Sequence, residues 1–395
     1  MWEVIRNKYE GYGDGRIENA ERNFHANSKH IAKFSCKPNP KEQDPNSCTP
    51  AIGSLLYTKL CQLTTSDNEI LVTKSMKSLQ ELYKASSKNI AASILYTDNQ
   101  IIPNLVDLTK KDYSKEEALK TLCCAFKCKH GRDSMLPHVQ SVLNDILRNF
   151  EIEKPEHVYL TLKWLKGLAL EKEACHQMTD SEDLPGLVMQ CLDYYQSKDM
   201  NPKVMKNGLK LLNQLLKVPK THVLLVAEDC IFLLIEKIFE RYLNGNYDEK
   251  VLIALMEHIS LLSFYTDGLT KCVRFIQQIM TLMETRNLSL LLQCICALSH
   301  ITISVEAKYQ IMEEASSIKS EFIRKITQIF DNYLVTYDNH YIFINTLKVI
   351  CNIAEKDRKA LRDLVSKIDS RLQQLNNPTV VDELEHTREV LSWSP

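Results

Sequence analysis

A chain of 395 residues has room for two or three ordinary domains or for one elongated array. Its 44% hydrophobic content supports a large core, and only 10 glycines and 12 prolines favour helices joined by short turns. The 49 basic and 50 acidic residues nearly cancel, which argues against nucleic acid as the main ligand, because phosphate binding requires a basic excess.

Cysteine usage and hydropathy predict the compartment. The 13 cysteines are odd in number and scattered among leucines, where a reduced thiol behaves as a small hydrophobe, so we expect no secreted disulfide framework. The first residues lack an apolar signal sequence, and no stretch approaches the ~18 apolar residues of a membrane span. We therefore expect a cytoplasmic protein that binds no membrane.

Residues 1–50 differ in composition and periodicity from the rest of the chain. Their four prolines and three glycines, without a sustained helical period, predict an extended N-terminal arm with a short helix around Ile17–His30. Aromatic residues alternate with charges along this arm: Trp2, Tyr9, Tyr12, Phe24 and Phe34. Aromatic anchors on an extended segment suit a chain that orders on a partner, so we expect these five to bind another protein. The alternative is a tail that binds nothing.

Residues 51–375 carry apolar residues at helical spacing. One motif recurs there at an average interval of about 45 residues, within the range of two- and three-helix repeats. Its copies are Leu79/Leu82/Ala85, Leu119/Leu122/Ala125, Leu162/Leu165/Leu168, Leu209/Leu212/Leu215, Leu255/His258/Leu261, Leu292/Ile295/Leu298 and Leu347/Ile350/Ile353. A unit of this kind exposes an apolar face that it cannot cover alone, so neighbouring units must stack.

A second motif precedes several of these copies. It places a proline between apolar residues, in Ile102-Pro103-Asn104-Leu105-Val106, Leu136-Pro137-His138-Val139 and Leu184-Pro185-Gly186-Leu187-Val188. Proline has a preset φ and no N–H to lose, so it suits the first turn of a helix. Each proline therefore predicts a helix start, with the following apolar residues facing inward.

The order Pro-x-Leu-Val-x-Leu followed by Leu-x-x-Leu-x-x-Leu resembles the second and third helices of an armadillo repeat. The resemblance covers roughly residues 51–375, in about seven copies, with HEAT repeats as the near alternative. It implies an all-α fold: an armadillo-like α-solenoid of about seven repeats behind the N-terminal arm. Residues 376–395 are then a C-terminal capping helix, expected from Val380 to Leu391, and a tail.

Armadillo repeats that hold extended peptides use an asparagine two residues after the middle leucine of the third helix. That column here holds Lys84, Cys124, Gly167, Gln214, Ser260, Ala297 and Asn352. Only Asn352 matches, with Gln214 as a substitute, so the resemblance leaves these two as peptide-binding candidates. The loss of the other asparagines argues against recognition of basic nuclear-import peptides.

A basic stripe is the other candidate for partner binding. Lys203, Lys206, Lys210 and Lys217 share one face of a helix that we expect to begin with Asn201 as N-cap and Pro202 in its first turn. Leucines take another face. A solvated surface is one interpretation. The sharper hypothesis is an acidic partner, tubulin being one candidate.

The chemistry-bearing residues form no recognisable catalytic or metal site. Cys123, Cys124, Cys128 and His130 are one tight group, whereas zinc usually takes two separated pairs, so packing explains them better. His258 on an apolar helix is more often a satisfied core histidine than a ligand. We therefore expect no enzyme activity, no metal and no cofactor.

These features predict a non-catalytic scaffold or adaptor that binds other proteins and no nucleic acid. The combination of short armadillo array and terminal arm is similar to armadillo proteins of ciliary axonemes, those of the radial spoke among them. That resemblance implies a structural subunit of a cytoskeletal assembly. The alternative is an armadillo-type regulator, an exchange factor for a chaperone or a small GTPase.

Overall fold

A computed structural model describes the parts of the chain on which the following account rests. They are residues 54–85, 101–126, 129–133, 135–148, 150–180, 183–197, 201–227, 229–244, 248–332, 340–375 and 377–393. All regular structure in these residues is helical, which confirms the predicted all-α fold. The helices form two compact units, residues 1–187 and 188–395. The predicted arm and its five aromatic residues lie outside the described residues.

The described helices of the first unit alternate between short and longer ones. They are α3 (Ser54–Leu63), α4 (Glu69–Ala85), α6 (Ile101–Leu108), α7 (Lys115–Ala125), α8 (Lys129–Asp133), the 3₁₀ turn η1 (Leu136–His138), α9 (Val139–Arg148), α10 (Pro155–Leu168) and α11 (Lys172–Asp180), with α12 (Asp183–Ser197) spanning the division. Helix α7 packs between α4 and α10, and α6 also lies against α7. The core of this unit therefore lies between helices about 40 residues apart in sequence.

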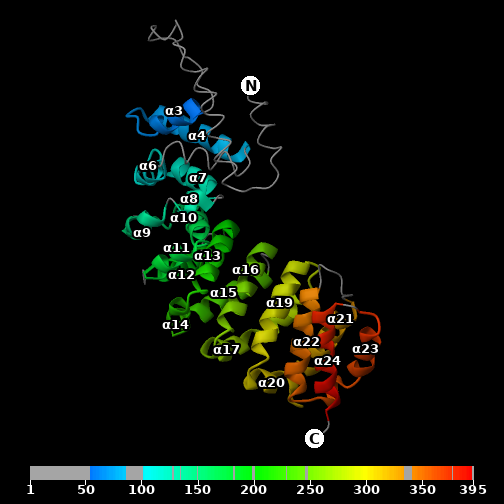
Figure 1. The fold of residues 1–395 in the computed structure, drawn as a ribbon. Coiled ribbons are helices and arrows are strands. Elements are labelled where there is room, and N and C mark those ends of the chain that lie inside the picture. Colours follow the sequence, from blue (N-terminus) through cyan, green and yellow to red (C-terminus); the bar gives the residue numbers. More distant parts are fainter. Residues whose placement is uncertain are drawn as a thin grey trace. The chain divides into compact units, whose positions relative to one another are not determined.

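The second unit repeats one order, in which a helix of seven to nine residues comes first and a helix of 14 or 15 residues comes last. They are α13 (Pro202–Leu215), α14 (Pro219–Ala227), α15 (Cys230–Leu243), α16 (Glu249–Leu262), α17 (Thr266–Cys272), η2 (Val273–Phe275), α18 (Ile276–Leu282), α19 (Leu288–Ile301), α20 (Val305–Met312), α21 (Lys319–Asn332), α22 (His340–Ala354), η3 (Lys359–Leu361), α23 (Leu364–Leu372) and α24 (Pro378–Ser392). The long helices α13, α16, α19, α22 and α24 pack in succession (Figure 1). Helices α16, α19 and α22 each lie between two of these neighbours and bury their apolar stripes there.

The seven copies of the leucine motif lie on α4, α7, α10, α13, α16, α19 and α22, but in several the register differs from the prediction. Counted from the N-caps, the α16 residues equivalent to Leu209, Leu212 and Leu215 of α13 are Met256, Ile259 and Leu262, all fully buried. The predicted member Leu261 is only half-buried. The apolar stripe of α16 is broad, so its periodicity alone could not select the register.

Side-chain caps set the starts of the long helices. Asn201 accepts hydrogen bonds from the backbone N–H groups of Lys203 and Val204, as predicted, and Pro202 occupies the first turn. Asp248 caps α16 and Asn287 caps α19 in the same way. Such a cap satisfies N–H groups that have no partner within the helix, which contributes about 1 kcal/mol.

The three prolines lie in first turns, as predicted. Pro103 is in α6, Pro137 is in η1 just before α9, and Pro185 is in α12. The apolar residues Leu105, Val139 and Val188 that follow them are buried. At the other end of the chain, α24 covers the helix that we expected from Val380 to Leu391, and it packs on α22 and α23.

Two glycines allow a short helix to pass close to the end of a long one. A Cβ added at Gly268 of α17 would lie 2.1 Å from the carbonyl oxygen of Leu262, at the end of α16. At Gly131 of α8 the corresponding distance is 2.4 Å, to the carbonyl oxygen of Ala125 at the end of α7. Both units therefore need a residue without a side chain at this crossing.

Candidate partner-binding surface

Helix α13 carries the predicted basic stripe, and its other faces are buried. Val204, Met205, Leu211 and Leu212 are fully buried, and Leu209 is nearly so. The helix packs on α16 along this apolar face. The burial holds α13 rigidly, so the polar residues on its remaining face have fixed positions.

The lysine column consists of Lys203, Lys206, Lys210 and Lys217, which follow each other at intervals of three, four and seven residues on α13 and the turn after it. Residues at such intervals lie on one face of a helix. Lys203 and Lys217 are exposed, and Lys206 and Lys210 are half-exposed. The structure thus confirms that the four predicted lysines share one accessible face.

The region around the lysine column has a strong positive charge, although the whole chain is nearly neutral. Residues 200–227 contain five lysines, the fifth being Lys220, and no Asp or Glu. The predicted candidate Gln214 lies within the column and accepts a hydrogen bond from Lys217 Nζ, with 3.0 Å between Nζ and Oε1. A local excess of this kind attracts an acidic surface over a Debye length of ~8 Å at physiological salt.

A buried polar pair joins α13 to α16 behind the lysine column. Asn213 Nδ2 donates to the carbonyl oxygen of Ala254 at 3.1 Å, so its Oδ1 accepts from His258 Nδ1 at 2.8 Å. Both side chains are fully buried, and burial lowers the pKa of His258 to about 3. His258 is therefore a neutral core histidine, as predicted. Its role is to fix the position of the helix that carries the lysines.

The asparagine column does not form in the predicted register. Counted from the N-caps, the residues equivalent to Gln214 are Leu261 in α16 and His300 in α19, so the prediction of Ser260 and Ala297 is wrong. Asn352 is half-buried, and its Nδ2 donates to the carbonyl oxygen of Ser299 and to Thr302 Oγ1, both at 3.0 Å. These two bonds use the donors that a bound peptide would need.

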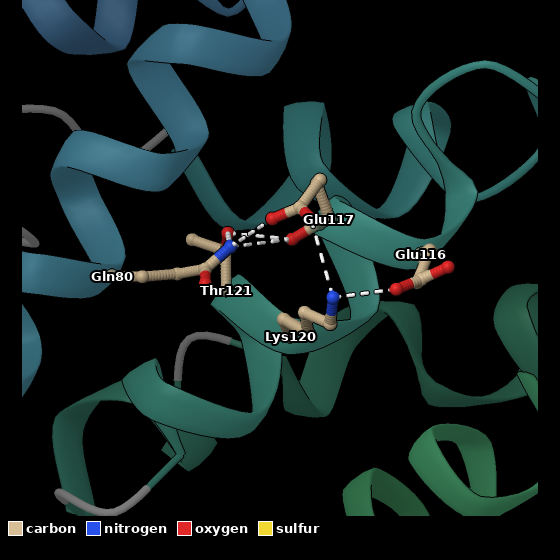
Figure 2. Close-up of polar contacts among 5 residues, drawn as sticks. All are labelled: Gln80, Glu116, Glu117, Lys120 and Thr121. Atoms are coloured by element: carbon tan, nitrogen blue, oxygen red, sulfur yellow. Dashed lines mark hydrogen bonds and ion pairs between the residues drawn. The ribbon is translucent and has the colours of Figure 1, made fainter. Parts of the chain in front are cut away.

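The first unit has a different polar contact at the equivalent junction, between α4 and α7. Gln80 Nε2 reaches Glu117 Oε2 at 2.8 Å and Thr121 Oγ1 at 3.2 Å (Figure 2). Lys120 pairs with both Glu116 and Glu117 on its own helix. The hydrogen bond from Lys120 lowers the pKa of Glu116. Charges at this junction are thus balanced within the helix itself.

A small cavity of about 50 Å³ lies between α6, α7, α9 and α10 of the first unit. Its polar rim includes two ion pairs, Lys110 with Asp145 at 3.0 Å and Lys115 with Glu151 at 3.3 Å. The indole Nε1 of Trp164, which lines the cavity, has no partner among the described residues. That atom is inaccessible to a water-sized molecule, so it offers no hydrogen bond to a ligand in the cavity.

The cysteines of the described residues show no metal-binding arrangement. Cys123 and Cys124 are half-buried on α7, whereas Cys128 lies outside the description. Within the described ranges, no three His, Cys, Asp or Glu residues lie together as metal ligands would. Burial raises the pKa of Cys191 and Cys272 to about 12, which keeps both as thiols.

Helix length and hydropathy also bear on membranes. In the part of the chain that the structure describes, no single helix is long and apolar enough to cross a bilayer. Helices α19 and α20 meet that length and composition only together, as a pair bent by 111°.

Comparisons with known proteins inform the fold. No family model matches the sequence, and neither does a curated protein. Among solved structures, an engineered protein is 16% identical with a TM-score of 0.51, over 62% of this chain and 98% of its own. Two further engineered proteins have TM-scores of 0.45 and 0.37 at 12% and 11% identity, over 86% and 76% of this chain and 100% and 96% of theirs. The likeness to the first concerns the all-helical fold alone.

Proposed function

We propose that this chain is a non-catalytic protein-binding scaffold, built as an armadillo-like α-solenoid of about seven repeats. The recurring order of a short helix first and a long helix last supports it. So does the sequence separation of side-chain hydrogen bonds between helices, which is 41 residues for Gln80–Thr121 and Asn213–Ala254, and 45 for Lys325–Met280. Contacts at a nearly constant separation in sequence are typical of stacked repeats.

The lysine column is the observation that carries the binding role. It presents three lysines on helix α13 and a fourth on the turn after it, within a stretch that has no carboxylate of its own. Lysines held on a packed helix and on the turn that follows it attract an acidic partner and increase its association rate. The partner of this scaffold is therefore an acidic protein segment.

Crosslinking mass spectrometry in native extract, with the full chain, would identify that partner and the lysines that contact it. A charge-reversed variant, Lys203→Glu with Lys206→Glu, Lys210→Glu and Lys217→Glu, should then bind it about 100-fold more weakly at low salt. The difference should shrink as salt screens the charges. Reversal of Lys74 and Lys77, two exposed lysines of α4, is the matched control. Equal binding by the charge-reversed variant would refute the proposal.

The proposal also includes the larger assembly to which the chain would belong. The resemblance to armadillo proteins of ciliary axonemes makes the axoneme the first place to look. Retention of the chain in isolated axonemes after detergent and high salt would support a structural subunit, whereas release with ordinary cytosol would contradict it. Stimulated nucleotide release from a chaperone or small GTPase would place the chain among exchange factors instead.

A further inference from the structure

Large apolar side chains are exposed at the turns that follow the long helices of the second unit. Phe264 is the second residue after α16 and is 70% exposed, and Ile303 is the second residue after α19 and is 56% exposed. Lys217 holds the same place after α13. The lysine column therefore ends in the row of turns where the apolar side chains begin.

A ring contact to His300 and short sequence spacing after it link these side chains. The ring of Phe264 lies edge-on to His300, with 6.0 Å between centroids, and His300 Nδ1 is 3.1 Å from the carbonyl oxygen of Ser260. Val305 and Tyr309 extend the surface onto α20, where Lys356 Nζ lies 3.5 Å from the centre of the Tyr309 ring. We name Phe264, Ile303, Val305 and Tyr309 the apolar edge.

The fold does not need the apolar edge for its core. Leu262 and Ile301, two residues before Phe264 and Ile303, are fully buried and fill the ends of α16 and α19. Single exposed apolar residues are ordinary, but a contiguous group on a protein surface marks an interaction site. The apolar edge is thus a surface that another molecule can cover.

The charges beside the lysine column determine how such a molecule lies. On α16, Glu257 stands at the place of Lys210, and Glu249 precedes Lys250 in the first turn. These carboxylates repel an acidic segment from α16 and keep it on α13. Only an uncharged part of the same segment can continue past Lys217 to Phe264.

We infer that the lysine column and the apolar edge bind one bipartite segment of a partner protein, an acidic stretch followed directly by an aromatic or aliphatic anchor. This inference rests on the proposed function and adds the anchor to it. The column from Lys203 to Lys217 rises ~21 Å along the helix, at 1.5 Å per residue. An extended chain covers that length in about six residues, which sets the length of the acidic stretch.

The test uses two fluorescent peptides and the full chain. One peptide has six acidic residues followed by Phe-Leu, and its twin has Ser-Ser in place of the anchor. Fluorescence anisotropy should give the anchored peptide an affinity at least about 10-fold higher. The double variant Phe264→Ser/Ile303→Ser should abolish that difference and leave the affinity of the twin unchanged. Leu233→Ser on α15, an equally exposed apolar position, is the matched control.

The outcomes separate the inference from the proposed function. Equal affinity of the two peptides for the natural chain would overturn the inference, as would a double variant that still prefers the anchored peptide. If Lys203→Glu/Lys210→Glu changes neither affinity, or if neither peptide binds, the acidic-partner proposal falls as well. Circular dichroism of each variant verifies that the helices are intact.

Discussion

The α4–α7 junction of the first unit and the α13–α16 junction of the second join the same kind of helix by different chemistry. At the first, Gln80 bonds to Glu117 and Thr121 at a charged edge, and Lys120 pairs with Glu116 and Glu117. At the second, Asn213 and His258 form a neutral and fully buried pair. A neutral buried pair adds no charge to the junction, and residues 200–227 contain five lysines and no Asp or Glu. The comparison shows that the same helical architecture can hold a junction whose charged side chains pair with each other, at α4–α7, and a helix with a positively charged exposed face, at α13.

The largest expected loss of stability comes from the glycine at the helix crossing, a feature that both units share. Gly268→Val should destabilise the second unit by about 3 kcal/mol or more, because the new side chain meets the Leu262 carbonyl oxygen, which belongs to the backbone and cannot rotate away. Gly131→Val should do the same in the first unit. Urea unfolding followed by circular dichroism measures both changes.

The control for these glycines is Gly186 of α12, where an added Cβ would have no atom within 4 Å. Gly186→Ala should stabilise the chain by about 0.5–1 kcal/mol through the better helix propensity of alanine. A Gly268→Val variant as stable as Gly186→Ala would show that α17 does not pass so close to α16.

Removal of the junction contacts should distinguish the two units. Asn213→Ala leaves the Nδ1–H of His258 without a partner in the core, which should cost about 2–3 kcal/mol. Gln80→Ala should cost about 1 kcal/mol, because Glu117 is partly open to water. Similar losses at the two sites, measured by urea unfolding, would contradict the distinction between buried and edge contacts.

The pH dependence of stability should also differ between the two junctions. Burial lowers the folded pKa of His258 to about 3, whereas the unfolded value is about 6.5, so the unfolded chain binds more protons between them. The stability due to neutral His258 is complete above pH ~6.5 and is lost as the pH falls toward 3. In the first unit, the pKa of Glu116 is lowered by Lys120, so its contribution is lost only below its ordinary value of 4.5.

Urea unfolding between pH 7.5 and 4.5 tests whether the contribution of His258 to stability is lost at higher pH than that of Glu116. His258→Leu should flatten the loss of stability in that range, and Glu116→Gln should leave it unchanged. His157 of the first unit also has its pKa lowered by burial, so the two variants must each be compared with the natural chain rather than one unit with the other. An unchanged slope in His258→Leu would contradict a neutral buried histidine.

The smallest effect on the free energy of unfolding is expected from substitutions of the surface charges. Lys210→Glu should change the free energy of unfolding by less than ~0.5 kcal/mol, since exposed charges contribute little to stability. Lys120→Glu should cost slightly more, about 0.5–1 kcal/mol, because it breaks two ion pairs and adds a third carboxylate. Thermal unfolding of both variants would show whether α13 tolerates the reversal that the binding experiment requires.

Much of the fold could be predicted because its signals are local. Spacing of Leu209, Leu212 and Leu215 predicted a buried stripe, and Asn201-Pro202 predicted the helix start, since capping involves neighbours in sequence. The register of α16 could not be predicted, because Leu255 and Met256 are both apolar and both fully buried. The cap Asp248 determines it, and its signal was present in the sequence but was not used.

The candidate site was predicted only in part. The lysine column needs one helix and one face, so periodicity alone located it. The apolar edge was missed, although an apolar residue two positions after a leucine-rich helix is a readable signal at Phe264 and Ile303. The role of Asn352 was misjudged, because its partners Ser299 and Thr302 are about 50 residues away.

The sequence by itself determined the helices, their caps, their buried stripes and the four lysines on one face, since each depends on residues within a few turns. The tertiary structure decided which polar groups meet across helices. It paired Asn213 with His258 and Asn352 with Ser299, and it brought the rings of Phe264 and His300 together. These contacts join residues that are 45 and 53 apart in the sequence for the two hydrogen bonds, and only the packing of whole helices brings such residues together.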